Sequence, residues 1–477
     1  MTVLAEFSNF IPEGGIWLNT QRPEWNDANN ALVGNGVSMV TLCYLRRFIG
    51  FFEGIIIKDD FKNTTISEEL ELFFKEVVST FNEFQDVLDG IISDAIRKNI
   101  LDGLGIAGSN FRTTIYEHGF KNLKKEITKA ELLNFFNLTK KFLDHTIAAN
   151  KREDNLYHSY NLMNLENENG ISISHLNEML EGQVAILSSG NLSSKEALKI
   201  LDGLKHSDLF RPDQYSYLLY PNKDLPRFIE KNKIPYPLVE SSELLKQLLE
   251  DGNAQIIEKD ELGNYHFNGN FNNSGSLDQA LTRLSEDKYQ PLIEKERMLL
   301  LNIFEKVFDH RSFTGRSGTF FGYEGLGSIY WHMVSKLLLA VQEVCLRAIE
   351  IEEDPTLVGK LLDHYYEINE GIGVHKSPEL YGAFPTDPYS HTPAGKGAQQ
   401  PGMTGQVKED ILCRFGELGV FVRSGKLQFR PQLLRRNEFL KESKIFRYTN
   451  VHQKSCEISL GKDSLCFTYC QIPIIYK

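Results

Sequence analysis

Apolar and polar residues along most of the chain follow the period of an α-helix. Between residues 70 and 88, apolar side chains recur at intervals of three and four, which places them on one face of a helix that packs on a core. The same spacing predicts helices over 36–57, 66–100, 128–150, 174–190, 193–205, 239–251, 275–308, 324–351, 355–370 and 405–418. Helices therefore dominate the expected fold.

The pattern changes after residue 419, where apolar and polar residues alternate at every second position. GVFVRSGKLQFRPQLL predicts a hairpin that turns at Ser424–Gly425, and IFRYTNV, CEISL and SLCFTYCQIPIIY continue as short strands. Residues 420–477 are thus expected to form a small β domain after a helical domain at 1–419. Stretches rich in Gly, Pro, Asn and Ser predict loops at 102–110, 261–276, 309–327 and 371–404.

The composition is that of a folded protein whose main partner is not expected to be a polyanion, although it leaves room for a local basic pocket. The 477 residues are 41% apolar and 24% charged, with a net charge of -12 and a pI near 5.6. Nucleic acid and anionic membranes need clustered Lys and Arg, so the chain is expected to bind neither. Six cysteines without a CxxC pair argue against a disulfide framework or a structural metal. The lack of a signal-peptide pattern or a long apolar run predicts a cytoplasmic protein.

The first candidate for chemistry is Asp27, in the stretch RPEWNDANNALVGNG ahead of an apolar helix. Asn and Asp are favoured before helices, so capping alone would account for this polar cluster. Capping leaves Trp25 unexplained, since an indole beside a carboxylate is a common way to hold a sugar ring against a proton donor. A helix cap and a proton donor in a sugar site both stay open on these residues alone.

Two later segments contain residues suited to binding. TFFGYEGLGSIYWHMVSKLLLAV places Glu324 in a glycine-rich loop and His332 at the opening of a helix, although a lone His there is more often a core residue. In QQPGMTGQVKEDILCRFGELGV, Thr404 and Gly405 precede another helix. Free N–H groups and the helix dipole at such a position suit phosphate, but Thr-Gly is also an ordinary cap.

Together, these segments resemble the cellobiose and chitobiose phosphorylases, inverting glycoside phosphorylases built on an (α/α) six-hairpin barrel. EWNDANNALVG is similar to their DWNDGMNxVG motif, and NLYHSYNLMNLENENG followed by EMLEGQVAILSSG resembles WYxRAYxDDG followed by PQSWAVLSG. SIYWHMVSKLLLAV resembles GGQYTHAAxWAV. PGMTGQVKEDILCRFGELGV with GKLQFRPQL resembles WxTGxAxWMYRxxLEGILGI with IxPCLP. The four matches keep the family's order over residues 22–431.

The resemblance implies a role for each matched residue. Asp27 becomes the general acid, and Trp25 becomes a wall of the donor-sugar subsite. The implied substrate-binding residues are Gln183, Tyr323 and Glu324, the last one residue away from the family's sugar-binding Glu. The implied phosphate cradle consists of His332, the hydroxyl of Thr404 and the N–H of Gly405. The resemblance implies no cofactor and no metal, only inorganic phosphate as co-substrate.

The chain departs from the family's plan before the acid. The family has a large β-sandwich, about half of the barrel and a phosphate-binding Arg there, whereas 26 residues precede Asp27. The expected fold is therefore mainly α: an (α/α) six-hairpin toroid lacking its N-terminal half, with insertions at about 60–150 and 205–275 and a small C-terminal β-sheet. The missing half belongs to another polypeptide or a longer protein, or the remaining helices close differently. An apolar face left open by the absent hairpins predicts self-association or a partner chain.

Three functions stay open from the sequence. The first is phosphorolysis of a β-linked di- or oligosaccharide with inversion, which needs one carboxyl group because phosphate is already anionic. The second is an inverting hydrolase, which needs a second carboxyl group to activate water, with Glu324, Glu379 or Asp387 as candidates. The third is a non-catalytic fragment that binds sugar or a partner. Tyr381, Asp387 and His391, in the loop at 370–393, are expected to set substrate choice.

Overall fold

The computed structural model describes residues 1–20, 32–165, 169–222, 226–284, 288–309, 327–372, 375–385, 389–393, 395–399 and 406–477. Its helices are α1 (Thr2–Phe7), α3 (Met39–Lys58), α4 (Glu68–Glu83), α5 (Asp94–His118), α6 (Lys129–Ala149), α7 (Leu180–Ser188), α8 (Ser194–His206), α9 (Phe228–Lys231), α10 (Tyr236–Glu240), α11 (Glu243–Glu250), α12 (Ser274–Arg283), α13 (Gln290–Phe308), α14 (Trp331–Glu350), α15 (Pro355–Glu370), α16 (Pro378–Tyr381) and α17 (Gln406–Glu417).

The strands are shorter than most of the helices. They are β1 (Phe10–Ile11), β2 (Gly15–Trp17), β3 (Gly36–Ser38), β4 (Asn63–Ser67), β5 (Lys124–Thr128), β6 (Tyr160–Asn164), β7 (Ser172–His175), β8 (Phe210–Arg211), β9 (Ser216–Tyr217), β10 (Ile257–Lys259), β11 (Tyr265–Phe267), β12 (Ile329–Tyr330), β13 (His391–Thr392), β14 (Val420–Arg423), β15 (Lys426–Phe429), β16 (Lys444–Thr449), β17 (Ser455–Leu460), β18 (Leu465–Tyr469) and β19 (Ile472–Tyr476).

The expected mainly-α toroid with a missing half is wrong. About 51% of the structure is helix and 18% is strand, and β1, β2, β3, β6 and β7 form, in that order, one curled antiparallel sheet. The register pairs Ile16 with Ser38 and Val37 with Asn161. These strands have two to five residues, too few for a pattern of alternation to identify them. The architecture is a mixture of helices and an antiparallel sheet.

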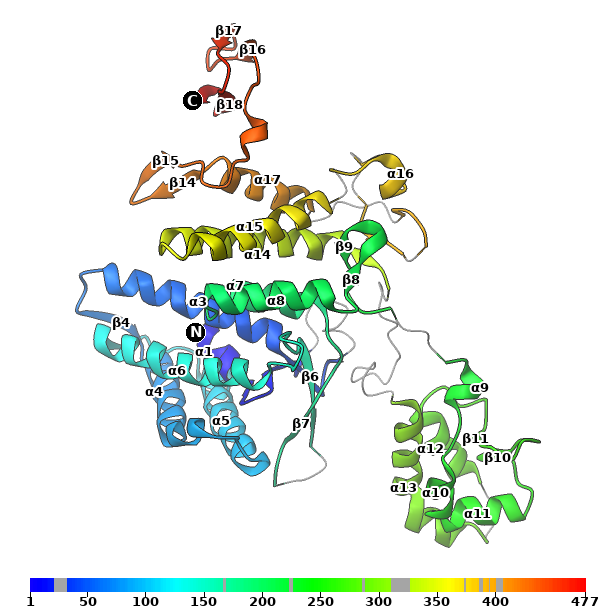
Figure 1. The fold of residues 1–477 in the computed structure, drawn as a ribbon. Coiled ribbons are helices and arrows are strands. Elements are labelled where there is room, and N and C mark those ends of the chain that lie inside the picture. The colour runs from blue at the N-terminus through cyan, green and yellow to red at the C-terminus, as the bar shows by residue number, and fades with distance from the viewer. Residues whose placement is uncertain are drawn as a thin grey trace.

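The helices of the main body form successive layers over one apolar core. Figure 1 shows α4, α5 and α6 at one end, followed by α3, by α7 and α8, by α14 and α15, and by α17. Buried residues of all these layers belong to a single core cluster. The sheet has its own contact with α5, where Leu101 packs among Ile11, Val37, Met163 and Ile171. The core therefore connects the N-terminal sheet to the C-terminal helices.

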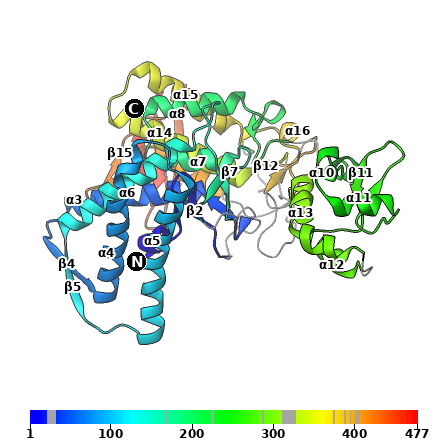
Figure 2. The same cartoon turned by 90° about the horizontal axis from the view of Figure 1, so that it is seen from below.

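Residues from α9 to α13 form a second unit with a core of its own. Its buried side chains extend from Ile234 to Phe308, and Figures 1 and 2 show the unit to one side of the main body. The buried carboxylate of Glu296 on α13 accepts hydrogen bonds from the Ser242 hydroxyl (2.7 Å) and the Leu244 N–H (3.0 Å), which satisfies the start of α11. A local network thus stabilises this unit independently of the main core.

Several predicted element boundaries are wrong. The single helix expected at 66–100 is α4 and the start of α5, separated by a 3₁₀ turn at Gln85–Asp89. The loop expected at 102–110 lies within α5, because its glycines permit close helix packing instead of turns. A Cβ on Gly103 would lie 2.9 Å from Thr80 Cγ2 of α4, and one on Gly108 would meet Ser8. Three further expected helices differ from the structure: 174–190 contains the end of β7 before α7, 275–308 is broken between α12 and α13, and 324–351 contains β12 before α14. Two expected loops contain regular structure: β11 and the start of α12 lie within 261–276, and α16 and β13 lie within 371–404.

Other predictions from the sequence are confirmed. The helices expected at 128–150, 193–205, 355–370 and 405–418 are α6, α8, α15 and α17. Ser424 and Gly425 have φ values of 51° and 71° and join β14 to β15, as a two-residue hairpin turn requires. The tail as a whole forms three separate hairpins instead of one sheet. Within the described residues, no helix combines the length and apolar character needed to cross a membrane.

One face of α3 carries an exposed apolar stripe. Tyr44, Phe48, Phe51, Phe52 and Ile55 recur at helical spacing and are all exposed, Phe51 to 66%. The charged side chains beside the stripe form ion pairs within the chain: Arg46 with Asp144, Arg47 with Glu343, and Glu53 with Lys140. A second copy of the chain would therefore meet an apolar surface whose neighbouring charges are already neutralised.

We expect this stripe to cause the self-association predicted from the sequence. Replacing Phe51 with Glu places a charge in the middle of the stripe and should shift the protein toward the monomer mass of 54.5 kDa. Light scattering coupled to size-exclusion chromatography measures the change. Ile91→Glu is the matched control, because Ile91 is 95% exposed and lies outside the stripe. A wild-type chain that stays monomeric at all concentrations would contradict the prediction.

Candidate functional site

The structure describes only part of the predicted site. Gln183 and His332 lie in described segments, as do Glu379, Tyr381 and His391. The predicted residues Trp25, Asp27, Tyr323, Glu324, Asp387, Thr404 and Gly405 lie outside the described residues. The candidate site is therefore built around His332.

His332 is the second residue of α14 and lies beside a small two-stranded sheet. Strand β12, immediately before α14, pairs antiparallel with β13, so that Tyr330 lies opposite His391. The Tyr330 ring stacks on His391 with centroids 4.8 Å apart and on His332 with centroids 5.7 Å apart. His391, from the predicted specificity loop, and His332 thus both pack on the Tyr330 ring.

The beginning of α14 is held by a buried Trp331. Its indole N–H donates to Thr392 Oγ1 at 2.9 Å, and its backbone N–H donates to the Ser390 carbonyl at 3.1 Å. The Lys376 ammonium lies 4.6 Å from the indole ring centroid, a cation–π contact. Arg211 holds β13 as well, because its guanidinium donates to the Thr392 carbonyl at 2.9 Å. These contacts fix the backbone that carries His332.

Lys376 is nearly buried between Trp331 and Gln214, whose Oε1 accepts from its ammonium at 3.2 Å. Burial, followed by the positive charge of Arg211, lowers the pKa of Lys376 to about 7, although Asp213 acts in the opposite direction. Lys376 therefore gains and loses its charge near neutral pH. The cation–π contact with Trp331 weakens as the pH rises through that value.

The surroundings of His332 are electropositive. Burial, followed by the charges of Lys336 and Lys408, lowers the pKa of His332 to about 4. The ring is then neutral at neutral pH and offers one N–H donor and one acceptor nitrogen. Lys336 is one helical turn after His332, whereas Lys408 comes from the first turn of α17. Neither lysine was predicted from the sequence as a site residue.

Helix packing explains why Lys408 lies near His332. Gln342 of α14 donates to the Cys413 carbonyl of α17 at 2.7 Å, and Gly416 allows the two helices to approach there. The N-terminal turn of α17 consequently lies beside the N-terminal half of α14. A sequence signal existed only for Lys336, which has i, i+4 spacing from His332.

Gln183 has contacts of a different kind. Its side chain is fully buried in α7, accepts from the Tyr157 N–H at 2.9 Å, and donates to the carbonyls of Tyr157 (2.7 Å) and Met179 (3.1 Å). These bonds hold the segment before β6 against α7. The sugar-binding role of Gln183 stays a prediction. Glu379 is exposed on α16, and Tyr381 packs edge-on against Trp331 with centroids 5.5 Å apart.

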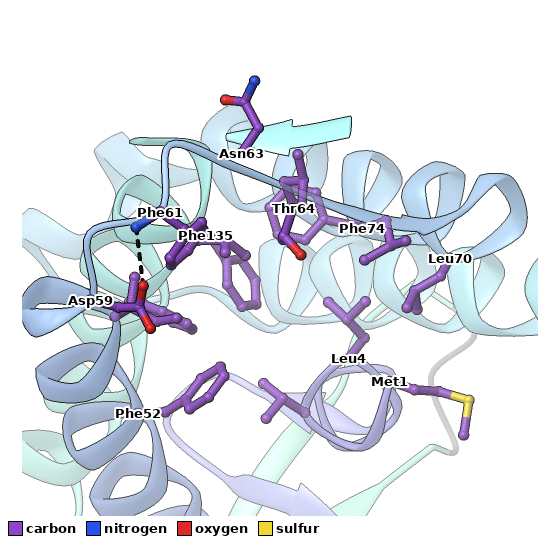
Figure 3. A pocket seen from close by; sticks show the side chains of 16 residues that line it. Met1, Leu4, Phe52, Asp59, Phe61, Asn63, Thr64, Leu70, Phe74 and Phe135 are labelled. Atoms are coloured by element: carbon purple, nitrogen blue, oxygen red, sulfur yellow. Dashed lines mark hydrogen bonds between the residues drawn. The ribbon is translucent and has the colours of Figure 1, made fainter. Parts of the chain in front are cut away.

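A separate cavity of about 550 Å³ lies in the N-terminal part of the fold, between α1, α3, α4 and α6. Its lining is mostly aliphatic and aromatic, and Figure 3 shows Leu4, Phe52, Phe61, Phe74 and Phe135 around it. The Asp59 carboxylate lies at the edge of the cavity and accepts a hydrogen bond from the Phe61 N–H at 3.0 Å. This carboxylate therefore already has a partner in a local turn. This lining suits an apolar group rather than a sugar or phosphate.

No metal centre is formed by the described residues, among which no group of three or more His, Cys, Asp or Glu could hold an ion. The positive charges of Lys336 and Lys408 near His332 make the start of α14 a candidate site for an anionic ligand. His and Lys side chains are suitable donors to an anion.

Part of the chain matches a known protein family. Residues 225–311 match the family model described as GH149 phosphorylase insertion domain 2. The segment coincides with the unit that has its own core, and it overlaps the addition expected at about 205–275. The match supports a relationship to glycoside phosphorylases, but it does not single out the cellobiose and chitobiose phosphorylases. No curated protein matches the chain.

Proposed function

We propose that the chain belongs to a glycoside phosphorylase and cleaves a β-linked di- or oligosaccharide with inversion, using inorganic phosphate as nucleophile. The observation that carries this proposal is the match of residues 225–311 to a phosphorylase insertion domain. The electropositive surroundings of His332 support it further, because a phosphorylase must hold a dianion next to the sugar.

In the proposed reaction, one carboxyl group is sufficient. A phosphate oxygen attacks the anomeric carbon from the side opposite the glycosidic oxygen, and protonated Asp27 donates its proton to that leaving oxygen. The products are an α-configured sugar 1-phosphate and a shortened sugar. Trp25, Gln183, Tyr323 and Glu324 are proposed to contact the sugar.

Phosphate is proposed to bind His332, the Thr404 hydroxyl and the Gly405 N–H. Helix α17 begins at Gln406, directly after this pair in the chain, which agrees with a cradle at a helix start. Since the pKa of His332 is about 4, its ring is neutral at neutral pH and contributes one N–H donor. Lys336 and Lys408 would supply the positive charge that the family draws from an Arg.

The decisive experiment follows phosphorus directly. The purified protein is incubated with β-linked glucosides of different linkage, with and without phosphate, and ³¹P NMR detects any sugar 1-phosphate. The proposal expects cleavage that requires phosphate and an α-anomeric product. Cleavage at the same rate without phosphate would identify a hydrolase instead. The lack of cleavage for every linkage would favour the non-catalytic alternative.

Thr404→Val tests the cradle. The substitution keeps the shape and removes one donor, so phosphate binding should weaken by about 1–3 kcal/mol, or roughly 5- to 150-fold, while the KM for sugar changes little. Steady-state kinetics with each substrate varied separately measures both constants. Thr356→Val at the start of α15 is the control, because it is exposed and also lies in a first helical turn. An unchanged KM for phosphate would remove Thr404 from the site.

A further inference from the structure

Glu409 is a buried carboxyl group that the proposed reaction does not use. It lies in the first turn of α17 and is only 5% exposed. Its Oε1 lies 3.8 Å from the Lys408 ammonium. Its Oε2 is buried and has no hydrogen-bond partner among the described residues. Burying a carboxylate oxygen without a hydrogen-bond partner costs free energy. Protonation of Glu409, or a change in the charge around it, would reduce this cost.

Glu409 lies on the face of α17 that packs against α14. Glu409 and Cys413 are separated by one helical turn, and the Cys413 carbonyl accepts from Gln342 of α14 at 2.7 Å. Lys336, about one and a half turns before Gln342, acts electrostatically on both Glu409 and His332. His332, Lys336, Lys408 and Glu409 therefore form one electrostatic cluster at the adjacent ends of two helices, and we call it the α14–α17 cluster.

Glu409, when ionised, offsets part of the positive charge of the α14–α17 cluster. The cluster contains two ammonium groups, a neutral imidazole and one carboxyl group. Burial raises the pKa of Glu409, and a hydrogen bond with its own backbone and the charges of Lys408 and Lys336 only partly oppose that effect. The pKa of Asp410, the next residue, is affected by burial and by other charged groups, namely His375, Glu417 and Arg414. Glu409 is consequently the acidic group that responds to a change in the charge of this cluster.

We propose that the α14–α17 cluster binds a dianionic group and that binding is coupled to the uptake of a proton by Glu409. A dianion bound beside Lys336 and Lys408 neutralises their positive charge in place of Glu409. Its negative charge also repels the ionised Glu409 carboxylate. The carboxylate then takes a proton from solvent, which removes the repulsion. This inference rests on the proposed function, in which phosphate is the dianion, and it makes Glu409 a positioning residue for that co-substrate.

Sulfate is the appropriate probe, because it stays dianionic between about pH 6 and 9 and takes up no proton itself. Titration calorimetry in two buffers of different ionisation enthalpy measures the protons taken up per sulfate bound. We expect wild-type protein to take up a fraction of a proton and to bind sulfate more weakly as the pH rises. The sign follows because binding raises the proton affinity of a carboxyl group.

Glu409→Gln imitates the protonated state. The variant should bind sulfate on the order of tenfold more tightly at the alkaline end of this range, with no proton uptake and a flat pH dependence. Asp410→Asn is the matched control and should leave both quantities at their wild-type values. Lys408→Gln should weaken sulfate binding in either background, because it removes a cation from the cluster.

Two results would overturn the inference in distinguishable ways. If Glu409→Gln retains the wild-type proton uptake, His332 or another group is the acceptor, and the anion site and the proposed reaction both stand without the coupling. If wild-type protein does not bind sulfate, the α14–α17 cluster is not an anion site. The separate ³¹P NMR assay then decides whether phosphorolysis occurs.

Discussion

Replacing Asp27 with Asn is expected to reduce the rate of phosphorolysis by about 10²–10⁴-fold, the usual contribution of general acid catalysis. The change is isosteric and removes only the transferable proton. Folding should therefore be preserved, which thermal unfolding can verify. If Asp27 were only a helix cap, Asn would replace it with little loss, because Asn caps helices as well as Asp does.

The dependence on the leaving group makes this test sharper. A substrate whose leaving group departs without protonation, such as a nitrophenyl glucoside, should lose much less rate in the Asp27→Asn variant than a disaccharide does. A loss that is equal for both substrates would mean that Asp27 acts in another way than as the acid. A variant that keeps more than about a tenth of the disaccharide activity would exclude Asp27 as the acid.

Replacing Arg97 with Met is expected to lower the free energy of unfolding by about 3–5 kcal/mol, because it removes the cation from the mostly buried Glu13 carboxylate and the donor from three backbone carbonyls. Arg97 is 5% exposed on α5. Its guanidinium donates to Glu13 Oε2 (2.6 Å), Asp94 Oδ1 (2.7 Å) and the carbonyls of Pro12 (3.0 Å), Ile92 (2.9 Å) and Ile171 (2.6 Å). It thereby joins the β1–β2 turn, α5 and the segment before β7.

Chemical denaturation measures this loss, and Arg112→Met on the exposed part of the same helix is the control.

The pH dependence of the stability gives a second observable. Although burial raises it, hydrogen bonds from His145, the Ile92 N–H and Arg97 lower the pKa of Glu13 below 4.5 overall. The stabilisation is thus present above that value and is lost as the pH falls through the folded-state pKa. The difference between wild type and Arg97→Met should shrink in acid. Equal stabilities of the two Met variants at neutral pH would contradict the role of Arg97.

The helices could be predicted where their apolar pattern extends over several turns. In α6 and α8, Thr128 with Glu131 and Ser193 with Glu196 also form capping boxes, so the start of each helix is determined locally. The strands of the five-stranded sheet could not be predicted, because they are too short to show an alternating pattern and because β3 pairs with β6, which is far away in the chain. Val37, for example, lies opposite Asn161.

The candidate site was predicted only in part, for the same reason. His332 was expected at the opening of a helix and lies there, at the second position of α14. Lys408 and Glu409 looked like ordinary charged residues of an amphipathic helix. Their proximity to Lys336 depends on the packing of α17 against α14, which no local pattern indicates. The burial of Arg97 could not be predicted from the sequence either, since most of its partners are backbone carbonyls.

The sequence by itself determined the features that depend on neighbouring residues: the amphipathic helices, the turn at Ser424–Gly425, and the acidic balance that argues against nucleic acid as a partner. Only the tertiary structure decided the antiparallel sheet, the separate core of residues 234–308 and the α14–α17 cluster. These features arise from pairing and burial between distant segments. A charge acquires its proton affinity there from groups that surround it in space rather than along the chain.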